Sequence, residues 1–283
     1  MDKKTDKGRE VKMNLVKFDM HCHTAECSPD AHVNICDYIE ILKSKGFGGM
    51  LVTDHDSYDG YFAYENSENK DRDFVVLRGI EYDTSDFGHM LVVMPQNLVP
   101  EVLRMRGLAL KRLVKIVHQY GGILGPAHPC GERFLSFFTT GILKKVQKDF
   151  FMKKFDFVEG YNACETEENN RDATELARDY KKVMTAGSDA HKKDCVGMAY
   201  TQLPDTIKTE DDLIGYIRQA SVIPFGGKRY GETTKDKLGI WNKGLVYGFF
   251  LYNKMGALLR FPARRRAFGQ IAYEMEGFKQ QSV

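Results

Sequence analysis

The sequence predicts an α/β fold in which short parallel strands alternate with crossover helices. Along residues 14–220, short runs rich in Val, Ile, Leu and Phe alternate with longer stretches of helical character. Most of the eight histidines stand where one of these apolar runs ends or begins, beside acidic residues and glycines. Seven such strands suit a small β/α barrel, and an open doubly wound sheet is the competing layout.

The elements expected in chain order follow from these runs and from helix stop signals. Strands are expected at Leu15–Met20, Gly49–Thr53, Phe74–Ile80, Met90–Met94, Gly122–Gly125, Phe155–Glu159 and Val183–Ala186. Helices are expected at Val33–Lys45, Glu101–Gln119, Thr166–Lys181 and Thr209–Gln219. Tyr120-Gly121-Gly122 marks the end of the second helix, because glycine commonly follows a helical C-terminus.

Three segments are expected along the chain. Residues 1–13 form a polar, disordered N-terminus, residues 14–220 form the β/α barrel, and residues 221–283 form a C-terminal extension that packs on the barrel or docks a partner. Hydrophobic residues make up 42% and charged residues 28% of the 283, which is ordinary for a soluble globular protein. A core of this size needs no disulfide or structural metal, so any metals are expected to be functional.

Cysteine usage and hydropathy indicate a cytoplasmic protein. None of the six cysteines forms a CxxC pair, and the charged start has no signal peptide, which favours free thiols in a reducing compartment. No apolar run approaches the ~18 residues needed to cross a bilayer. Residues 221–283 contain eleven Lys and Arg against four Asp and Glu, so the extension is basic.

The segment from Asp19 to His23 is the first candidate metal site. Residues two apart in a strand point to the same side, so the imidazoles of His21 and His23 can face one metal. Asp189 and His191 repeat this spacing after the strand Val183–Ala186.

Other candidate ligands follow further strands. They are His55, Glu81, His89 and His128. In a parallel β/α barrel these positions converge on one rim. Imidazoles and carboxylates together suit Zn, Mn or Fe, and carboxylates that bridge two ions favour a multinuclear site.

The ordered motifs HxH, SPD, TDH, GxE, GH, AHP and GSDAH, spread over Phe18 to Met198, resemble the PHP (polymerase and histidinol phosphatase) family. The resemblance implies a distorted seven-stranded (β/α)7 barrel with a trinuclear metal centre, here followed by a basic and aromatic C-terminal extension. It also implies a metal-dependent phosphoesterase that binds two or three divalent ions.

The family's ligands carry over motif by motif. One metal would be held by His21, His23, Glu81 and Asp189; a second by Glu81, His89 and His128; a third by Asp30, His55 and His191. Asp30 could instead cap the helix Val33–Lys45. Asp19 and Asp54 are expected to orient neighbouring ligands.

The expected reaction is hydrolysis of a phosphate monoester by a metal-activated hydroxide. Glu81, Asp189 and His191 are the expected catalytic residues, with Asp189 or His191 assisting protonation of the leaving group. Stand-alone members of the family resemble phosphatases of nucleotides and nucleoside bisphosphates. Many of those carry a long helical insertion that the 38 residues between His89 and His128 do not accommodate. Histidinol phosphate or a sugar phosphate is therefore the alternative substrate.

Contacts to the substrate phosphate are expected from polar residues near the rim, although each Arg or Lys could equally be a solvated surface charge. The candidates are Arg133, Asn162, Arg171, Lys228 and Arg229.

Two other classes of function remain open at this point. The basic tail could belong to a nucleic-acid-processing module, although no obligate nucleic-acid partner is expected. Residues 243–266 could instead lie in an anionic lipid interface, and packing of this apolar-aromatic stretch on the barrel is the favoured alternative.

Overall fold

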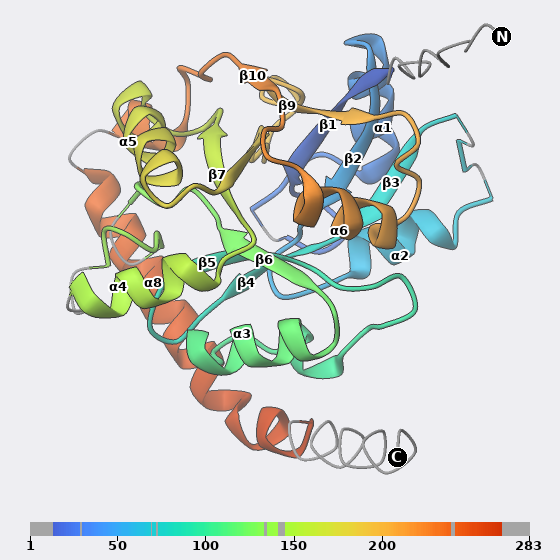
Figure 1. The fold of residues 1–283 in the computed structure, drawn as a ribbon. Helices are drawn as coiled ribbons and strands as arrows, with labels where there is room; N and C mark the ends of the chain where they lie inside the picture. Colours follow the sequence, from blue (N-terminus) through green and yellow to red (C-terminus); the bar gives the residue numbers. More distant parts are fainter. Residues whose placement is uncertain are drawn as a thin grey trace, which may run out of the picture.

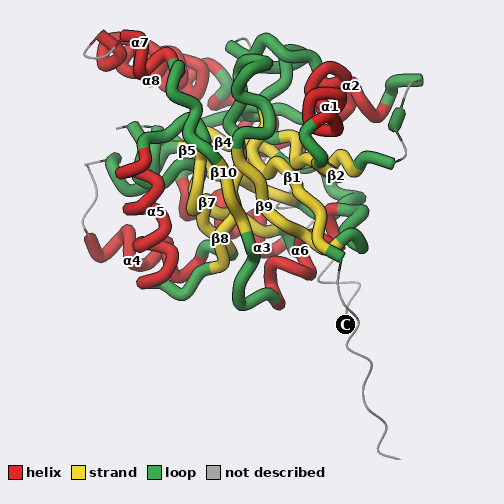
Figure 2. The backbone as a smooth tube through the Cα atoms, turned by 90° about the horizontal axis from the view of Figure 1, so that it is seen from above, coloured by secondary structure: helices red, strands yellow, loops and turns green. Residues whose placement is uncertain are grey.

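The computed structural model describes residues 14–28, 30–68, 70–71, 73–132, 135–140, 145–238 and 241–267. Seen from above, the strands form the centre of the molecule and the helices surround them (Figure 2). The expected disordered segment 1–13 lies outside the described residues, as do the last residues of the expected extension, 268–283.

The largest sheet contains the N-terminal strands. Its order is β10-β9-β1-β2-β3, and Figure 1 shows how these strands lie relative to the helices. The strands are β1 (Leu15–Cys22), β2 (Phe47–Val52), β3 (Val75–Arg78), β9 (Ala199–Pro204) and β10 (Phe225–Gly227). β1, β2 and β3 are parallel, whereas β9 runs antiparallel to both β1 and β10. Neither β9 nor β10 was expected from the sequence.

Two smaller sheets complete the fold. β4 (Ile80–Asp83), β5 (His89–Val93) and β6 (Ile123–Pro126) form an antiparallel sheet, and β7 (Phe157–Asn162) pairs in parallel with β8 (Val183–Gly187). A tight turn joins β4 to β5, in which the Thr84 hydroxyl donates to the Gly88 carbonyl at 2.7 Å and Gly88 has a φ of +76°. So short a connection forces the two strands to be antiparallel.

The fold is therefore mixed α/β, but the expected seven-stranded barrel is not confirmed. The described residues form ten strands in three sheets that no hydrogen-bonded ladder closes, and four of the seven ladders are antiparallel. One cause is Gly79, which splits the strand expected at Phe74–Ile80 into β3 and β4. A Cβ at this glycine would lie 3.0 Å from the Leu51 side chain, so the chain approaches β2 closely where it changes sheet.

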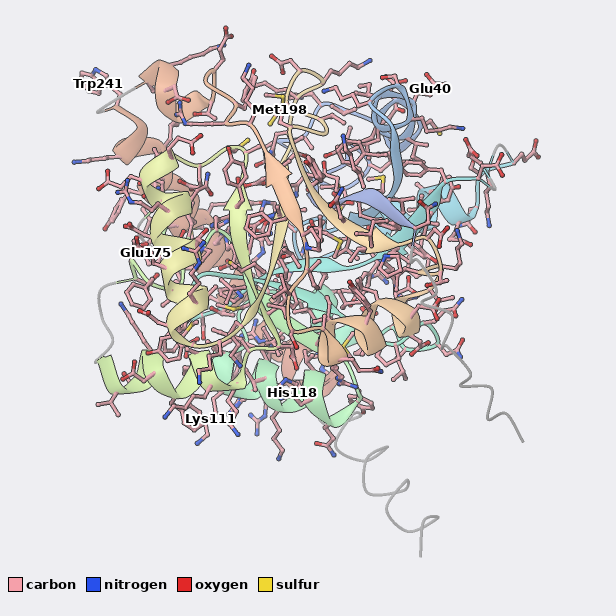
Figure 3. All side chains as sticks on the ribbon, turned by 45° about the horizontal axis from the view of Figure 1, so that its top comes forward. Glu40, Lys111, His118, Glu175, Met198 and Trp241 are labelled. Carbon is pink, nitrogen blue, oxygen red and sulfur yellow. The ribbon has the colours of Figure 1, made fainter. Side chains whose placement is uncertain are left out.

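The helices lie outside the sheets. They are α1 (Ile35–Ser44), α2 (Asp59–Glu65), α3 (Leu110–Gln119), α4 (Lys145–Lys154), α5 (Glu167–Asp179), α6 (Glu210–Gln219), α7 (Thr234–Leu238) and α8 (Asn242–Leu259). Side-chain caps fix several starts: Asn34 caps α1, Thr166 caps α5, and Thr209 with Asp212 forms a capping box on α6. His118 lies on the peripheral helix α3 (Figure 3), where its Nε2 atom is 2.9 Å from Asp156 Oδ2.

The helix expected at Glu101–Gln119 is two elements rather than one. A single 3-10 turn, Glu101–Arg104, is separated from α3 by a loop that contains Gly107. Gly107 has a φ of +98°, a conformation that other residues rarely adopt, so a continuous helix cannot pass through it.

The helix α8 lies on the outside of the molecule beside this loop (Figure 1). Arg106 donates to the Asn253 side chain, and the Lys254 ammonium donates to the Ser85 carbonyl at 2.6 Å. No described helix combines the length and apolar character that a membrane span requires.

Candidate metal centre

The site begins at the end of β1, where His21 and His23 are fully buried. Their Nε2 atoms face each other at 3.1 Å, as the two-residue spacing predicts. The other ring nitrogen of His21, Nδ1, lies 2.9 Å from the Glu159 carboxylate. Since a carboxylate accepts, Nδ1 carries the hydrogen and the Nε2 lone pair of His21 points into the site.

The Glu81 carboxylate on β4 is the centre of the site. Its Oε2 atom lies 3.2 Å from His23 Nε2 and 3.1 Å from His55 Nδ1. Its Oε1 atom lies 3.0 Å from both His89 Nδ1 and His128 Nε2. An isolated backbone bridge between His55 and Glu81 holds the two chain segments together. One carboxylate thus contacts imidazoles from four different places in the chain.

Asp189 closes the site from the segment after β8. Its Oδ1 atom lies 3.2 Å from His23 Nε2 and 3.5 Å from His21 Nε2, and its backbone N–H donates to the His21 carbonyl at 2.8 Å. Asp189 has a φ of +51°, a sparsely populated conformation that clusters at functional sites. Nearby, His191 Nε2 lies 3.3 Å from Asp30 Oδ2.

The structure thus brings all nine expected ligands to one place, which we call the histidine–carboxylate cluster. Its members are His21, His23, Asp30, His55, Glu81, His89, His128, Asp189 and His191. Three overlapping groups have ligand atoms within 4.8 Å of one another: His23 with His55 and His191, His21 with His23 and Glu81, and His55 with Glu81 and His89. His55 therefore lies against Glu81 as well as on the side of His191, where the resemblance placed it.

The donor set fits divalent transition metals. Lone pairs of imidazoles and carboxylates converge without a Lys or Arg ion pair to Glu81 or Asp189 among the described residues. His89 Nε2 is buried and has no hydrogen-bond partner in the described part of the chain. Imidazole nitrogens and carboxylate oxygens together suit Zn, Mn or Fe, so these residues could hold such ions.

The electrostatics also favour bound positive charge. Burial alone raises the pKa of Glu81, but His89, His55 and His21 outweigh it and leave that pKa well below its usual range. Burial disfavours protonated His23, but Asp189 and Glu81 raise its pKa to about 10. Burial holds the pKa of His55 well below its ordinary value, so this imidazole is neutral and able to coordinate.

Glu159, on β7, supports the cluster and was not among the expected site residues. Besides its contact with His21, its Oε2 atom accepts from the His128 backbone N–H at 2.6 Å and from the Asn162 amide at 3.2 Å. Its place three residues before Asn162, at the end of an apolar strand, was the signal that could have identified it. Carboxylates that fix the outer nitrogen of a ligating histidine orient the ring and raise its basicity.

Asp19 and Asp54 organise the loops that carry ligands. Asp19 accepts from the Ser188 backbone N–H at 2.8 Å, directly before Asp189. Asp54 accepts from the Thr24 backbone N–H at 2.6 Å and from the Thr24 hydroxyl at 2.7 Å, directly after His23.

The residues expected to contact substrate are dispersed. Asn162 lies in the site, where its buried amide donates to Asp189 Oδ2 at 3.1 Å and to Glu159, so it positions these carboxylates. Arg171 lies on α5 with its side chain 62% exposed, and Arg229 donates to the Glu165 carbonyl at 3.2 Å. Arg133 lies outside the described residues.

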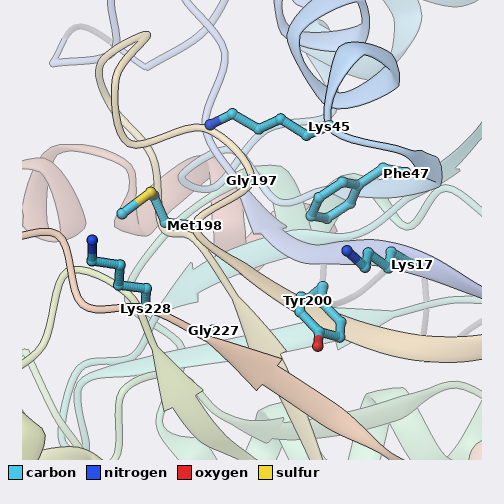
Figure 4. A pocket seen from close by; sticks show the side chains of 8 residues that line it. All are labelled: Lys17, Lys45, Phe47, Gly197, Met198, Tyr200, Gly227 and Lys228. Atoms are coloured by element: carbon cyan, nitrogen blue, oxygen red, sulfur yellow. The ribbon is translucent and has the colours of Figure 1, made fainter.

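Lys228 lines a different pocket, on the flank of β1 and β9. Figure 4 shows it with Lys17, Lys45 and the rings of Phe47 and Tyr200, none of which belongs to the cluster. The volume of this pocket is about 380 Å³.

A second pocket, of about 540 Å³, opens on the cluster at His55. We call it the arginine pocket, because Arg104, Arg106 and Arg260 line it. None of these three was expected from the sequence: Arg104 ends the 3-10 turn, Arg106 lies in the loop that follows it, and Arg260 directly follows α8.

Comparisons with known proteins agree with these motifs. Residues 19–193 match the family model described as PHP domain, and residues 167–222 match the model described as PHP-associated. None of the curated proteins searched matches the chain.

Several solved structures share the fold. PsfC from Pseudomonas syringae PB-5123 superimposes with a TM-score of 0.57 at 18% identity, covering 86% of this chain and 99% of that one. A protein from Bifidobacterium adolescentis ATCC 15703 superimposes with a TM-score of 0.50 at 16% identity, covering 71% of this chain and 94% of that one. Its own metal-dependent phosphoesterase activity is inferred. Endonuclease Q was solved with a 27-mer duplex that has an abasic lesion at the active site. It superimposes with a TM-score of 0.53 at 16% identity, covering 72% of this chain and 57% of that one. At these identities the likeness concerns the fold alone.

Proposed function

Because the chain belongs to the PHP domain family, whose model matches 19–193, we propose that it is a metal-dependent phosphoesterase that hydrolyses phosphate monoesters at the histidine–carboxylate cluster. The observation that carries the proposal is the contact of one buried carboxylate, Glu81, with imidazoles from four chain segments. Such an arrangement of lone pairs is built to hold cations.

The ligands divide as the motifs suggest. His21, His23, Glu81 and Asp189 would hold one ion; His89 and His128 would share Glu81 around a second; Asp30 and His191, with His55, would hold a third. When bound, such ions activate water for attack at phosphorus and offset charge on the phosphoryl oxygens.

The protein's own side chains supply orientation and proton transfer. Glu159 fixes the ring of His21, and Asn162 holds Asp189. His191 has the most exposed imidazole of the cluster, with 27% of its side chain accessible beside Asp30. Its Nδ1–H donates to the Asp189 carbonyl at 3.0 Å, so its Nε2 atom would either hold the third ion or, while that position is empty, carry the proton given to the departing oxygen.

A small substrate, such as a nucleotide, suits this site better than a polymer does. Glu81 is 1% exposed, and the adjoining arginine pocket of about 540 Å³ has the size of a small-ligand site. Histidinol phosphate and sugar phosphates remain candidates within the same reaction.

A nucleic-acid phosphodiester is the second candidate substrate. It is supported by the fold shared with endonuclease Q and by the pocket of Figure 4, where three lysines and two aromatic rings could contact a nucleic-acid strand. Cleavage of oligonucleotides that weakens steeply with salt would favour this candidate over monoesters.

The test combines elemental analysis with a phosphatase screen of nucleotides, bisphosphates, sugar phosphates and histidinol phosphate. Glu81→Gln should lower kcat/KM by about 100-fold or more, with loss of bound metal, because every group of ligands contacts this carboxylate. Glu40→Gln, on the exposed face of α1, is the matched control and should retain both. Full activity and metal content in Glu81→Gln would refute the proposal.

A further inference from the structure

The arginine pocket adjoins the cluster through one shared residue. His55 lines the pocket, and its Nδ1 atom lies 3.1 Å from Glu81 Oε2. A monoester whose phosphate lies at the cluster must extend its leaving group into adjoining space. Of the two pockets described, only this one includes a member of the cluster. The leaving group is therefore expected to meet the pocket wall.

Two of the three arginines are already neutralised. Arg104 pairs with Asp59 at 2.8 Å and with Glu101 at 3.5 Å. Arg106 pairs with the buried Asp56 at 3.0 Å, and its guanidinium lies 5.5 Å from the centre of the Tyr252 ring. These contacts hold the two side chains in the pocket wall. The positive charge of each guanidinium is already paired with a carboxylate of the protein.

Arg260 differs from them. It is exposed at the pocket edge, and its closest described polar contact is the Arg104 carbonyl, at 3.5 Å. It forms no ion pair with any residue in the described ranges. Its positive charge is therefore available to a ligand.

The end of α8 is held in place against the pocket. A Cβ at Gly107 would lie 2.6 Å from the Ala257 Cβ, so loop and helix touch at this glycine. Arg264, which is 9% exposed, donates to the Arg106 carbonyl and, at 3.1 Å, to the Ala257 carbonyl. With Asn253 accepting from Arg106, these contacts fix the backbone on both sides of Arg260.

We propose that α8 forms a wall of the leaving-group pocket and that Arg260 selects monoesters whose leaving group carries a negative charge. This inference rests on the proposed phosphoesterase function. It gives α8 a role in substrate selection, and this role does not involve the residues that would hold metal.

A matched substrate pair tests the proposal. With metal-loaded protein, kcat/KM for 3- and 4-carboxyphenyl phosphate is compared with that for phenyl phosphate, in wild type, Arg260→Ala, Arg260→Lys and Arg265→Ala. Arg260→Ala should lower the preference for the carboxylated esters about tenfold and leave phenyl phosphate within about twofold, since one charge-assisted contact is lost. Arg260→Lys should retain part of the preference, and the exposed control Arg265→Ala all of it. An equal effect on both kinds of ester, or no effect, would overturn the proposal.

A binding measurement separates this inference from the catalytic one. Calorimetric titration with 4-carboxyphenylphosphonate and phenylphosphonate, which are not hydrolysed, should give the same Arg260-dependent preference in affinity. If that preference is present but no ester is turned over, the proposed function fails and the pocket assignment stands. If esters are hydrolysed and wild type binds both phosphonates equally, the pocket assignment fails alone.

Discussion

The histidine–carboxylate cluster and the arginine pocket share His55, yet they are built differently. In the cluster, His21 is fully buried, Glu81 is 1% exposed, and each contacts several partners from distant strands. In the pocket, Arg104 is 36% exposed and Arg260 depends on a helix held by a few contacts near Gly107. In the proposed enzyme this difference would separate two tasks: the strands would fix the catalytic residues, and the peripheral helix would select the substrate.

This separation predicts that substitutions in the two regions have different readouts. Changes around the cluster should alter metal content and turnover together. Changes at α8 should alter substrate preference or local order while metal content stays constant.

Apart from Glu81→Gln, the largest effect should follow from Glu159→Ala. The substitution removes the acceptor for the buried His21 Nδ1 and leaves the partly buried His128 N–H unpaired, which costs about 1–3 kcal/mol of folding free energy. Loss of such an orienting carboxylate lowers metal affinity about 10–100-fold. Competition with a chelator and thermal unfolding measure the two effects.

Glu159→Gln is the informative partner of that variant. It keeps one oxygen acceptor, so part of the contacts to His21, His128 and Asn162 remains, and its metal affinity should fall between those of wild type and Glu159→Ala. Wild-type metal affinity in Glu159→Ala would show that the carboxylate only fills space.

An intermediate effect should follow from Gly107→Ala. Its φ of +98° and the close approach of Ala257 oppose a side chain there, so α8 should loosen at a cost of about 1–3 kcal/mol. Hydrogen exchange along Asn242–Leu259 should speed up, and metal content should not change. Gly215→Ala, in α6 with open space around it, is the control and should be neutral or stabilising. Metal loss in Gly107→Ala would mean that the two regions are not separable.

The smallest effect should follow from Leu258→Ser on the outer face of α8. Leu258 is 74% exposed, so its removal should change the free energy of unfolding by no more than about 0.5 kcal/mol. Thermal unfolding measures this. Marked destabilisation would mean that the outer face of the helix is covered in solution, and co-sedimentation with anionic vesicles would then test a lipid surface as the cover.

The sequence predicted the members of the histidine–carboxylate cluster far better than it predicted the sheets that carry them. Period-two spacing placed His21 beside His23, because that geometry is local to one strand. The family resemblance is confirmed by the model match over 19–193. The barrel is not confirmed, because sheet closure depends on contacts between sheets, and a single glycine, Gly79, redirected one expected strand into another sheet.

Residues that act through long-range contacts were the ones missed. Glu159 reaches His21 across 138 positions of sequence, so no local pattern could pair them. Arg260 reaches the 3-10 turn at Arg104 where α8 packs against Gly107, and a lone glycine in a loop does not identify its neighbour.

The backbone bond from Asp189 to the His21 carbonyl has a consequence for biosynthesis. It joins the first strand to the segment after the eighth, so closing this loop is a late, slow step that requires most of the chain. Asp189 and His191 can therefore join the other members of the cluster only after the residues up to about 190 have left the ribosome. In the proposed site, a chain that ends before residue 189 would therefore lack Asp189 and His191 and could complete only the ligand set of Glu81, His89 and His128.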